Sequence, residues 1–276
     1  MTLYFIHRGQ CRKGKQMTFE GKVALLTGSG RGIAKEAALQ MAAQGAAIVL
    51  NDIVEERLRQ AEADVKATGA DVLAVNADVT KPQQVQEMVA RAVHIFGSVD
   101  ILVNSAGGSL QTPRFLEEIS EEDWARVVDF NLGSQFRCTK AVVPFMKKKG
   151  WGRIVNIASS AGTHGEPLAW SPAYSAAKAG VLGFTRQIAI ELGRHGITCN
   201  AISQGDTETE RSHELWAEGL WPETEEEIRE RYKHHPIPRM ARPAEVAAVI
   251  TFLCSSEASY INAENIMVTG GAFISP

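Results

Sequence analysis

A tyrosine and a lysine four positions apart could carry out acid–base chemistry. They lie in the run Tyr174-Ser-Ala-Ala-Lys178, in a segment whose pattern predicts a helix, where positions i and i+4 project from one face. A lysine ammonium beside a phenol favours the phenolate, which would lower the tyrosine pKa from its model value of about 10 and make it a usable general base. The same spacing is common in ordinary helices that merely expose both side chains, so the pair needs support from other residues.

A serine fifteen positions before Tyr174 could hold a substrate oxygen. Ser159 follows the predicted strand 153–158, and Ser160 comes directly after it. Since successive strand residues face opposite ways, only one of the two hydroxyls can point at Tyr174.

A glycine-rich run could bind the phosphates of a nucleotide. Residues 27–34 read Thr-Gly-Ser-Gly-Arg-Gly-Ile-Ala and connect a predicted strand to a predicted helix. Glycines let the backbone turn tightly and approach a pyrophosphate, whose charge is met by the amide groups and the positive dipole end of the helix. Taken alone, the run is equally consistent with a simple glycine-rich turn.

An acidic residue beyond this run bears on which nucleotide would bind. Asp52 stands 24 residues after Gly28, at the end of the second predicted strand, where a carboxylate can accept hydrogen bonds from the adenosine ribose hydroxyls. It would repel a 2′-phosphate, which favours NAD over NADP. Arg31 argues weakly in the other direction, because a cation in the loop could meet that phosphate.

An alternation of buried strands and amphipathic helices must position these groups. Apolar runs bounded by turns predict seven strands, at 23–27, 47–51, 72–76, 100–103, 153–158, 197–202 and 266–269. Helical patterns lie at about 33–44, 55–68, 82–96, 122–148, 173–194 and 243–254. We therefore predict a single α/β domain over 17–276, a Rossmann-type fold in which helices cover both faces of a doubly wound, seven-stranded parallel sheet.

One segment, 206–235, breaks this alternation. It is rich in glutamate and follows the end of a strand, where open α/β sheets bind their ligands, so we predict that it forms a lid over the site. Its large apolar side chains are Leu215, Trp216, Leu220 and Trp221. They would either line an apolar pocket or simply pack the lid against the rest of the protein.

Composition and charge exclude several classes of protein. Of the 276 residues, 45% are hydrophobic and 22% are charged, as in a folded globular chain. Four of the 29 basic residues lie in the first sixteen positions, which leaves 25 against 32 acidic residues elsewhere and disfavours nucleic-acid binding. The apolar runs are too short to span a membrane. The cysteines are scattered, so the sequence predicts no disulfides and favours a cytoplasmic location. The histidines lack metal-ligand spacing, so it predicts no metal site.

The first sixteen residues stand apart from the predicted domain. Their apolar run has four residues, too few for a signal peptide, although their basic, acid-free composition is also that of a transit peptide. We expect a disordered tail, or an upstream start ahead of Met17.

The chain as a whole resembles the short-chain dehydrogenase/reductase family, in which these motifs occur in this order and spacing. The likeness runs from about residue 19 to 271. It selects Ser159 over Ser160 and implies that Asn131, Ser159, Tyr174 and Lys178 are catalytic. In the family the asparagine positions a water in a proton relay, and the lysine also bonds the nicotinamide ribose.

The resemblance further implies a set of cofactor-binding residues. Thr209 would bond the nicotinamide carboxamide, while Asp78 and Val79 would frame the adenine. The full set is Thr27, Gly28, Ser29, Arg31, Gly32, Ile33, Asp52, Asp78, Val79, Asn104, Ala106, Gly107, Tyr174, Lys178, Gly205, Thr207 and Thr209.

The chain departs from the family pattern at five positions. Ala34 replaces the third glycine of the loop, Ser105 the second asparagine of the N-N-A-G motif, and Gln204 a proline at the end of a strand. Ala241 and Ala263 stand where the family often has glycine. If these two alanines have positive φ, each adds strain of about 1 kcal/mol.

These inferences lead to three candidate functions. The first is an oxidoreductase that transfers a hydride between NAD(H) and a hydrophobic or cyclic secondary alcohol or its ketone, because ten acidic against four basic residues in the lid disfavour a polyanionic substrate. The second is an NADPH-dependent 3-oxoacyl reductase that acts on acyl carrier protein or coenzyme A thioesters. The third is a non-catalytic dinucleotide-binding protein. The family resemblance also implies a homotetramer.

Overall fold

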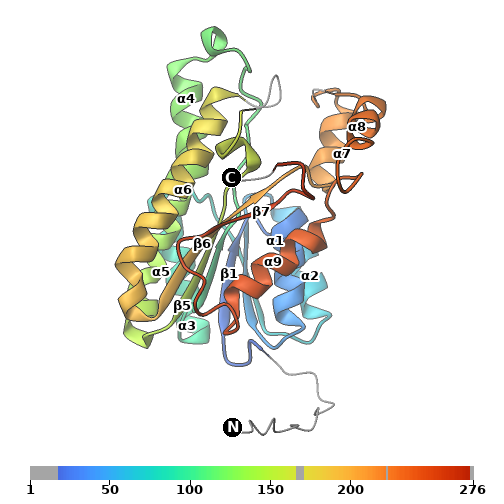
Figure 1. The fold of residues 1–276 in the computed structure, drawn as a ribbon. Coiled ribbons are helices and arrows are strands. Elements are labelled where there is room, and N and C mark those ends of the chain that lie inside the picture. The colour runs from blue at the N-terminus through green and yellow to red at the C-terminus, as the bar shows by residue number, and fades with distance from the viewer. Residues whose placement is uncertain (1–17, 166–170, 222, 274–276) are drawn as a thin grey trace, which may run out of the picture.

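The protein folds around one parallel sheet of seven strands (Figure 1). The computed structural model describes residues 18–165, 171–221 and 223–273. The strands are β1 Val23–Thr27, β2 Ala47–Asp52, β3 Val72–Asn76, β4 Ile101–Asn104, β5 Gly152–Ile157, β6 Ile197–Gln204 and β7 Asn265–Val268. They lie in the order β3-β2-β1-β4-β5-β6-β7, and each neighbouring pair is parallel. The predicted fold class and all seven strands are confirmed, whereas the predicted tail, 1–16, lies outside the described residues.

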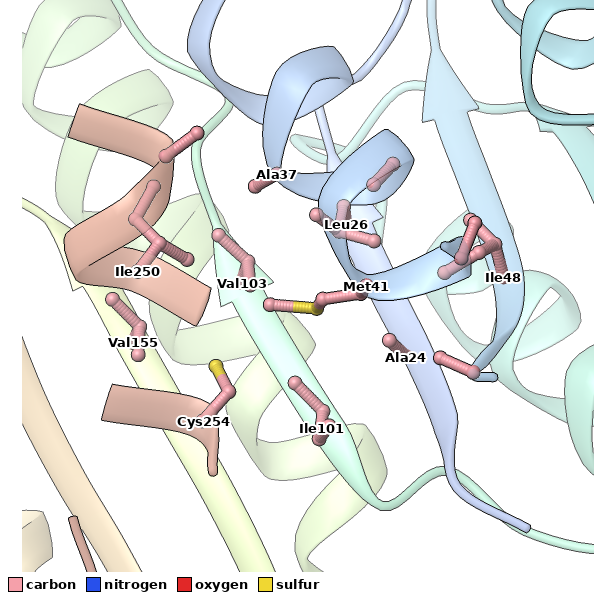
Figure 2. Close-up of a cluster of buried hydrophobic side chains, with 14 of the residues drawn as sticks. Ala24, Leu26, Ala37, Met41, Ile48, Ile101, Val103, Val155, Ile250 and Cys254 are labelled. Carbon is pink, nitrogen blue, oxygen red and sulfur yellow. The ribbon is translucent and has the colours of Figure 1, made fainter. Parts of the chain in front are cut away.

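Alternating side chains divide the core into two layers. On β1, Ala24 and Leu26 point into one cluster while Val23 and Leu25 point into the other, because successive strand residues face opposite sides of the sheet. Figure 2 shows the first cluster, in which Met41 reaches from a helix toward the strands. Since both faces are covered, every residue of β1 is buried, which explains the continuous apolar run in the sequence.

Helices cover the two faces of the sheet. On one face lie α1 Gly32–Ala42, α2 Glu55–Lys66 and α9 Pro243–Cys254, with α1 and α9 side by side (Figure 1). On the other lie α3 Pro82–Phe96, α5 Ser134–Lys149 and α6 Pro172–Leu192, and α4 Glu121–Val128 packs against α6. In the described part of the chain, none of the helices has both the length and the apolar character of a membrane span.

One helix differs from its prediction. The sequence predicts an unbroken helix over about 122–148, but the structure has α4, then a π-helical turn at Asp129–Gly133, then α5. A π-turn adds one residue to a helical turn and is often found at functional sites. One extra residue hardly changes the periodicity averaged over a long helix, so the apolar pattern does not reveal it. The turn contains the buried Asn131.

The lid contains two short helices, α7 Glu210–Ala217 and α8 Glu225–Tyr232. Each helix begins with a capping box, at Thr209 and at Thr224, which satisfies amide groups of the first turn. Figure 1 shows both helices beyond the carboxyl ends of the strands. That this segment, which we call the lid, acts as one stays a prediction.

The chain changes direction between β1 and β4, which are neighbours in the sheet although they are not consecutive in the sequence. From β1 the chain continues into α1 on one face, and from β4 it leads toward α4 and α5, on the opposite side of the sheet. In open α/β sheets such a switch point leaves a crevice at the carboxyl edge, where ligands bind. The loops after these two strands are the glycine-rich run and the segment that begins at Asn104.

Ala263 has the strained, positive φ that the sequence analysis considered for two alanines. Its φ is +68°. Among the described residues, Ala241 is not one of those with a positive φ. An alanine in the left-handed region costs about 1–2 kcal/mol of strain, which a glycine would relieve. The extra conformational freedom of glycine in the unfolded chain offsets about half of the stability gained. We expect Ala263→Gly to raise the free energy of unfolding by about 0.5 kcal/mol in urea titrations.

Ala241→Gly is the matched control for this prediction. It removes the same methyl group without relieving strain, so it should lower the free energy of unfolding by about 0.5–1 kcal/mol. If both variants were destabilised to the same extent, the strain at Ala263 would have no energetic weight.

Candidate active site

Tyr174 and Lys178 lie one turn apart on the buried face of α6. The start of this helix is fixed by Pro172 in its first turn and by the Ser171 hydroxyl, which accepts a hydrogen bond from Tyr174 N at 3.3 Å. Tyr174 is 7% exposed and Lys178 is 2% exposed. The Lys178 ammonium nitrogen lies 5.6 Å from the centroid of the tyrosine ring. The pair is therefore part of an enclosed site and not a pair of exposed side chains.

Burial moves the pKa values of both residues toward their neutral forms. It raises the pKa of Tyr174 to about 12, against the opposing effect of a hydrogen bond with Ser159. Burial also lowers the pKa of Lys178 to about 7. The sequence predicts that the lysine lowers the tyrosine pKa, and the structure gives the opposite direction. The reason is that the phenol is deeply desolvated, while Lys178 Nζ donates to Ile157 O at 2.8 Å and is itself easily deprotonated.

Ser159 is the one of the two adjacent serines that hydrogen-bonds to Tyr174. It follows β5 and begins a short 3₁₀ turn, where its hydroxyl also accepts a hydrogen bond from Ala161 N at 3.2 Å. The side chain is buried beside the tyrosine. The geometry therefore agrees with the serine that the family resemblance selects.

Asn131 ties the π-helical turn to the loop after β4. Its Nδ2 donates to Val127 O and to Gly108 O, both at 2.9 Å, and its Oδ1 accepts from Gly108 N at 3.0 Å. A Cβ on Gly107 would lie 2.7 Å from Asn131 Oδ1 and 3.3 Å from Lys178 Nζ, so this glycine lets the loop pack against both side chains. Asn131 thus positions the loop, and its part in a proton relay stays a prediction.

The loop after β1 turns at Gly28 and enters α1 at Gly32. Their φ angles are +63° and +60°, in the left-handed region that favours glycine. A Cβ on Gly28 would lie 2.9 Å from Ala106 Cα, so glycine allows the loops after β1 and β4 to touch. Gly30 N donates to Asp52 Oδ2 at 3.0 Å, which places this carboxylate beside the loop.

Three of the predicted cofactor-binding side chains support these loops from behind. Thr27 Oγ1 accepts hydrogen bonds from Ser105 N and Ala106 N at 3.0 and 3.1 Å. Ser29 is buried and donates to a carbonyl of β1 at 2.9 Å, and Asn104 is buried among polar side chains of α5 and β5. Because the two hydroxyls and Asn104 Nδ2 form hydrogen bonds inside the protein, these side chains hold the loops in place, and none of the three lines the cavity.

A cavity of about 560 Å³ joins the glycine loop to the tyrosine and lysine. This volume lies in the range of small-molecule and cofactor sites. The predicted site residues that line it are Gly28, Arg31, Gly32, Ile33, Asp52, Asp78, Val79, Ala106, Gly107, Ser159, Tyr174, Lys178, Gly205, Thr207 and Thr209. Residues from loops far apart in the sequence thus converge on one cavity at the carboxyl edge of the sheet.

Apolar side chains line part of this cavity. Both uses foreseen for the lid residues occur, since Leu215 and Trp221 line the cavity while Trp216 packs within the lid against α8. Leu220 does neither and is 47% exposed. Leu110, which the sequence analysis missed, also lines the cavity, with a φ of +54° that is unusual for leucine.

Two acidic residues of α7 also reach this part of the site and were missed. Glu210 Oε2 accepts a hydrogen bond from Gly32 N at 3.1 Å, and Glu214 forms ion pairs with Arg31 and Arg57. Their spacing of four would have placed both glutamates on one face of a helix. Nothing in the sequence shows that this face meets the glycine loop, because the contact joins segments about 180 residues apart.

The residues of the cavity fit a bound nicotinamide dinucleotide. Gln204 lines the cavity, and its Oε1 is buried without a hydrogen-bond partner among the described residues, so a donor on a ligand would satisfy it. Gly32 opens α1 at the helix end where anions bind, and its N–H already donates to an anionic group, the Glu210 carboxylate. Within the same described ranges, no group of three or more His, Cys, Asp or Glu side chains could hold a metal ion.

Comparison with known proteins agrees with this geometry. A family model described as enoyl-(acyl carrier protein) reductase matches residues 28–272, almost the whole described chain. The chain belongs to the short-chain dehydrogenase/reductase family. It is therefore an oxidoreductase that acts on CH–OH or ketone groups with a nicotinamide dinucleotide, and the non-catalytic alternative is set aside.

Two relatives illustrate the range of the similarity. The chain is 38% identical over 255 residues to "(2S)-[(R)-hydroxy(phenyl)methyl]succinyl-CoA dehydrogenase subunit BbsD" of Thauera aromatica, which covers 92% of this chain and 98% of that protein. It is 37% identical over 258 residues to "3-oxoacyl-[acyl-carrier-protein] reductase FabG" of Vibrio cholerae, covering 94% of this chain and 100% of that protein.

Solved structures of the family superpose closely on this short-chain dehydrogenase/reductase. Levodione reductase gives a TM-score of 0.86 at 34% identity, covering 92% of this chain and 100% of that one. NAD⁺-bound xylitol dehydrogenase gives a TM-score of 0.84 at 31% identity, covering 92% and 99%.

The contact between Gly28 and Ala106 makes a testable prediction about cofactor binding. In Gly28→Ala the new methyl group would meet Ala106 Cα at 2.9 Å and strain a backbone with φ of +63°, so the two loops must separate. We expect affinity for NADH, followed by nicotinamide fluorescence, to fall by at least about tenfold, or about 1.4 kcal/mol.

Gly69→Ala is the matched control for Gly28→Ala. Gly69 has a φ of +84° with nothing within 4 Å of its added Cβ, so the substitution strains the backbone without a clash. It should lower the melting temperature yet leave NADH affinity unchanged. Wild-type affinity in Gly28→Ala would show that the contact between the loops does not shape the cofactor site.

Proposed function

We propose that this oxidoreductase transfers a hydride between NAD(H) and a secondary alcohol or its ketone, with Tyr174 as the general acid and base. The observation that carries the proposal is the meeting of Ser159, Tyr174 and Lys178 in one cavity with the glycine loop. General-acid or general-base catalysis requires such a group within hydrogen-bond reach of the substrate oxygen.

Each polar side chain then has a distinct task. NAD(H) in the cavity would supply the acceptor or the donor of the hydride. In the oxidative direction Tyr174 Oη takes the proton of the substrate hydroxyl, and in the reductive direction it returns that proton. Ser159, already hydrogen-bonded to Tyr174, holds the same substrate oxygen. Lys178 would bond the nicotinamide ribose. Asn131 fixes the adjoining loop and would position a water that exchanges the proton with solvent.

The glycine loop and its neighbours hold the cofactor. Gly28 and Gly32 would admit the pyrophosphate to the start of α1, and Thr209 would bond the carboxamide. Asp52 is anchored by two amides, since its Oδ2 accepts from Gly30 N at 3.0 Å and its Oδ1 from Val54 N at 2.9 Å. The remaining lone pairs of this carboxylate can accept hydrogen bonds from the adenosine ribose hydroxyls.

The cavity wall favours an apolar substrate. Leu110, Leu215 and Trp221 supply apolar surface, and the acidic lid disfavours a polyanion. A second candidate, the NADPH-dependent reduction of a 3-oxoacyl thioester, is favoured by similarity to proteins named as acting on such thioesters. The homotetramer stays a prediction from the family resemblance, and the cytoplasmic location stays one from the scattered cysteines.

Parallel titrations with NADH and NADPH separate these two candidates. Because a 2′-phosphate would meet the Asp52 carboxylate, we expect NADH to bind at least about tenfold more tightly, as measured by nicotinamide fluorescence. Tighter binding of NADPH, together with faster turnover of a 3-oxoacyl thioester than of any simple ketone, would replace the first candidate by the second.

Removal of the tyrosine hydroxyl tests the catalytic assignment. Tyr174→Phe should lower kcat by about 10³-fold or more, because general-base catalysis by a positioned group contributes about 10²–10⁴-fold and no other group replaces it. NADH affinity should stay within about twofold of the wild type, since the ring and Lys178 remain. Steady-state kinetics and NADH titration supply the two readouts.

Tyr232→Phe is the matched control, because it removes the hydroxyl of another buried tyrosine, which donates to Asp206 at 3.0 Å in the lid. It should retain most of the turnover.

The pH profile gives an independent readout of the role of Tyr174. Burial raises the pKa of Tyr174 to about 12, so the phenolate fraction should rise from neutral to alkaline pH, and kcat/KM for oxidation should rise with it. Substantial, pH-dependent turnover by Tyr174→Phe would remove Tyr174 from the mechanism.

A further inference from the structure

A carboxylate of the lid reaches across to the part of the cavity that surrounds Asp52. Glu214, on α7, places its Oε1 2.5 Å from Arg31 Nη1 and 3.4 Å from Arg57 Nη2. Its Oε2 lies 3.4 Å from Arg211 of the same helix. The lid is therefore joined to the glycine loop and to α2 through one acidic side chain.

The two arginines belong to the same end of the cavity as Asp52. Arg31, Arg57 and Asp52 all line it. A Cβ built on Gly30 would lie 2.6 Å from Asp52 Oδ2 and 2.9 Å from Arg57 Cβ, so these side chains surround a single glycine. Guanidinium groups bind phosphates through paired, charge-assisted hydrogen bonds. Of these three residues, Asp52 would repel a 2′-phosphate, whereas Arg31 and Arg57 would attract it.

Glu214 forms ion pairs with both arginines, and these ion pairs bear on whether the arginines can bind a 2′-phosphate. The Arg31 side chain is 19% exposed and that of Glu214 is 38% exposed, so solvent screens the closer contact only in part. Burial acts to raise the pKa of Glu214, but the hydrogen bond and charge of Arg31 and the charge of Arg57 outweigh it and hold this pKa below its usual range. The carboxylate is therefore ionised at neutral pH. A 2′-phosphate would have to displace it from both guanidinium groups and remain close to it.

We propose that Glu214 is a cofactor-specificity residue that acts from the lid, because it occupies Arg31 and Arg57 and so keeps both from binding a 2′-phosphate. The proposal rests on the proposed function, whose preference for NAD it assigns to a second carboxylate besides Asp52. NAD has no phosphate at this position, so its binding leaves the ion pairs intact.

A second contact of α7 supports this arrangement. Glu210, one turn before Glu214, accepts the hydrogen bond from Gly32 N, so the same face of the helix touches the loop at two points. This contact fixes how α7 lies over the loop, and it places Glu214 between the two arginines. The specificity contact is therefore part of how the lid docks.

Glu214→Gln is the variant that tests the proposal. It keeps the shape of the side chain and removes its charge, so both arginines become available to a phosphate. The wild type and the variant are titrated with NADH and with NADPH under identical conditions, following nicotinamide fluorescence. We expect the Kd for NADPH to fall by about tenfold while the Kd for NADH changes by less than about twofold. The gain should shrink as salt is raised, because exposed charges are screened.

Two controls separate this local effect from a general loss of negative charge. Glu218→Gln makes the same charge change at the exposed end of α7 and should leave the NADPH-to-NADH ratio of Kd values unaltered. Adding Arg31→Gln and Arg57→Gln to Glu214→Gln should abolish the gain in NADPH affinity. An equal change for both cofactors, an equal effect of Glu218→Gln, or a gain that survives loss of the arginines would each overturn the proposal.

The failure of this inference is distinguishable from failure of the proposed function. Tighter NADPH binding by the wild type would contradict the proposed preference for NAD. The role of Glu214 is judged separately, on whether the ratio of the two Kd values changes between the wild type and Glu214→Gln. An unchanged ratio would overturn that role whichever cofactor the wild type prefers.

Discussion

Because the seven strands are parallel, all of their carboxyl ends meet at one edge of the sheet, and the site depends on this constraint. The order of the strands makes β1 and β4 neighbours, so the loops that follow them leave in opposite directions and open a crevice between them. The two loops touch at Gly28 and Ala106. Thr27 holds this contact in place because its hydroxyl accepts hydrogen bonds from two amides of the second loop. Residues that the chain separates by more than a hundred positions are brought together by strand order alone.

Desolvation is the second constraint. Placing a lysine at 2% exposure is costly for its charge, and the nearby carbonyl of Ile157 offsets only part of that cost. The protein thereby keeps a phenol and an amine side by side, with both pKa values moved toward the neutral forms, and burial strengthens the effect of any added charge. Such a site responds to whatever charge a bound cofactor brings, more than a solvated pair would.

The sequence predicts much of this architecture, for identifiable reasons. Buried parallel strands are continuous apolar runs, so β1 to β7 are visible in the pattern. A glycine run between a strand and a helix predicts a phosphate-binding loop once the later motifs accompany it. Asp52 is visible because it closes a strand at a characteristic distance from the loop. What stays hidden depends on distant contacts or on small changes in helical pitch. The π-helical turn at Asn131 alters one residue in a long helix, and the raised pKa of Tyr174 depends on how deeply the folded chain buries the ring.

The lid gives the site a property that follows from its contacts at both ends. Leu215 of α7 lines the cavity, and one residue earlier in the same helix Glu214 pairs with Arg31 and Arg57. Because the two residues are adjacent on a helix of eight residues, a shift of the helix moves both contacts together. The proposed roles of Leu215 and Glu214 thus link substrate choice to cofactor choice. By the same argument, replacing the lid so that the protein accepts a different ketone would also change its affinity for the dinucleotide.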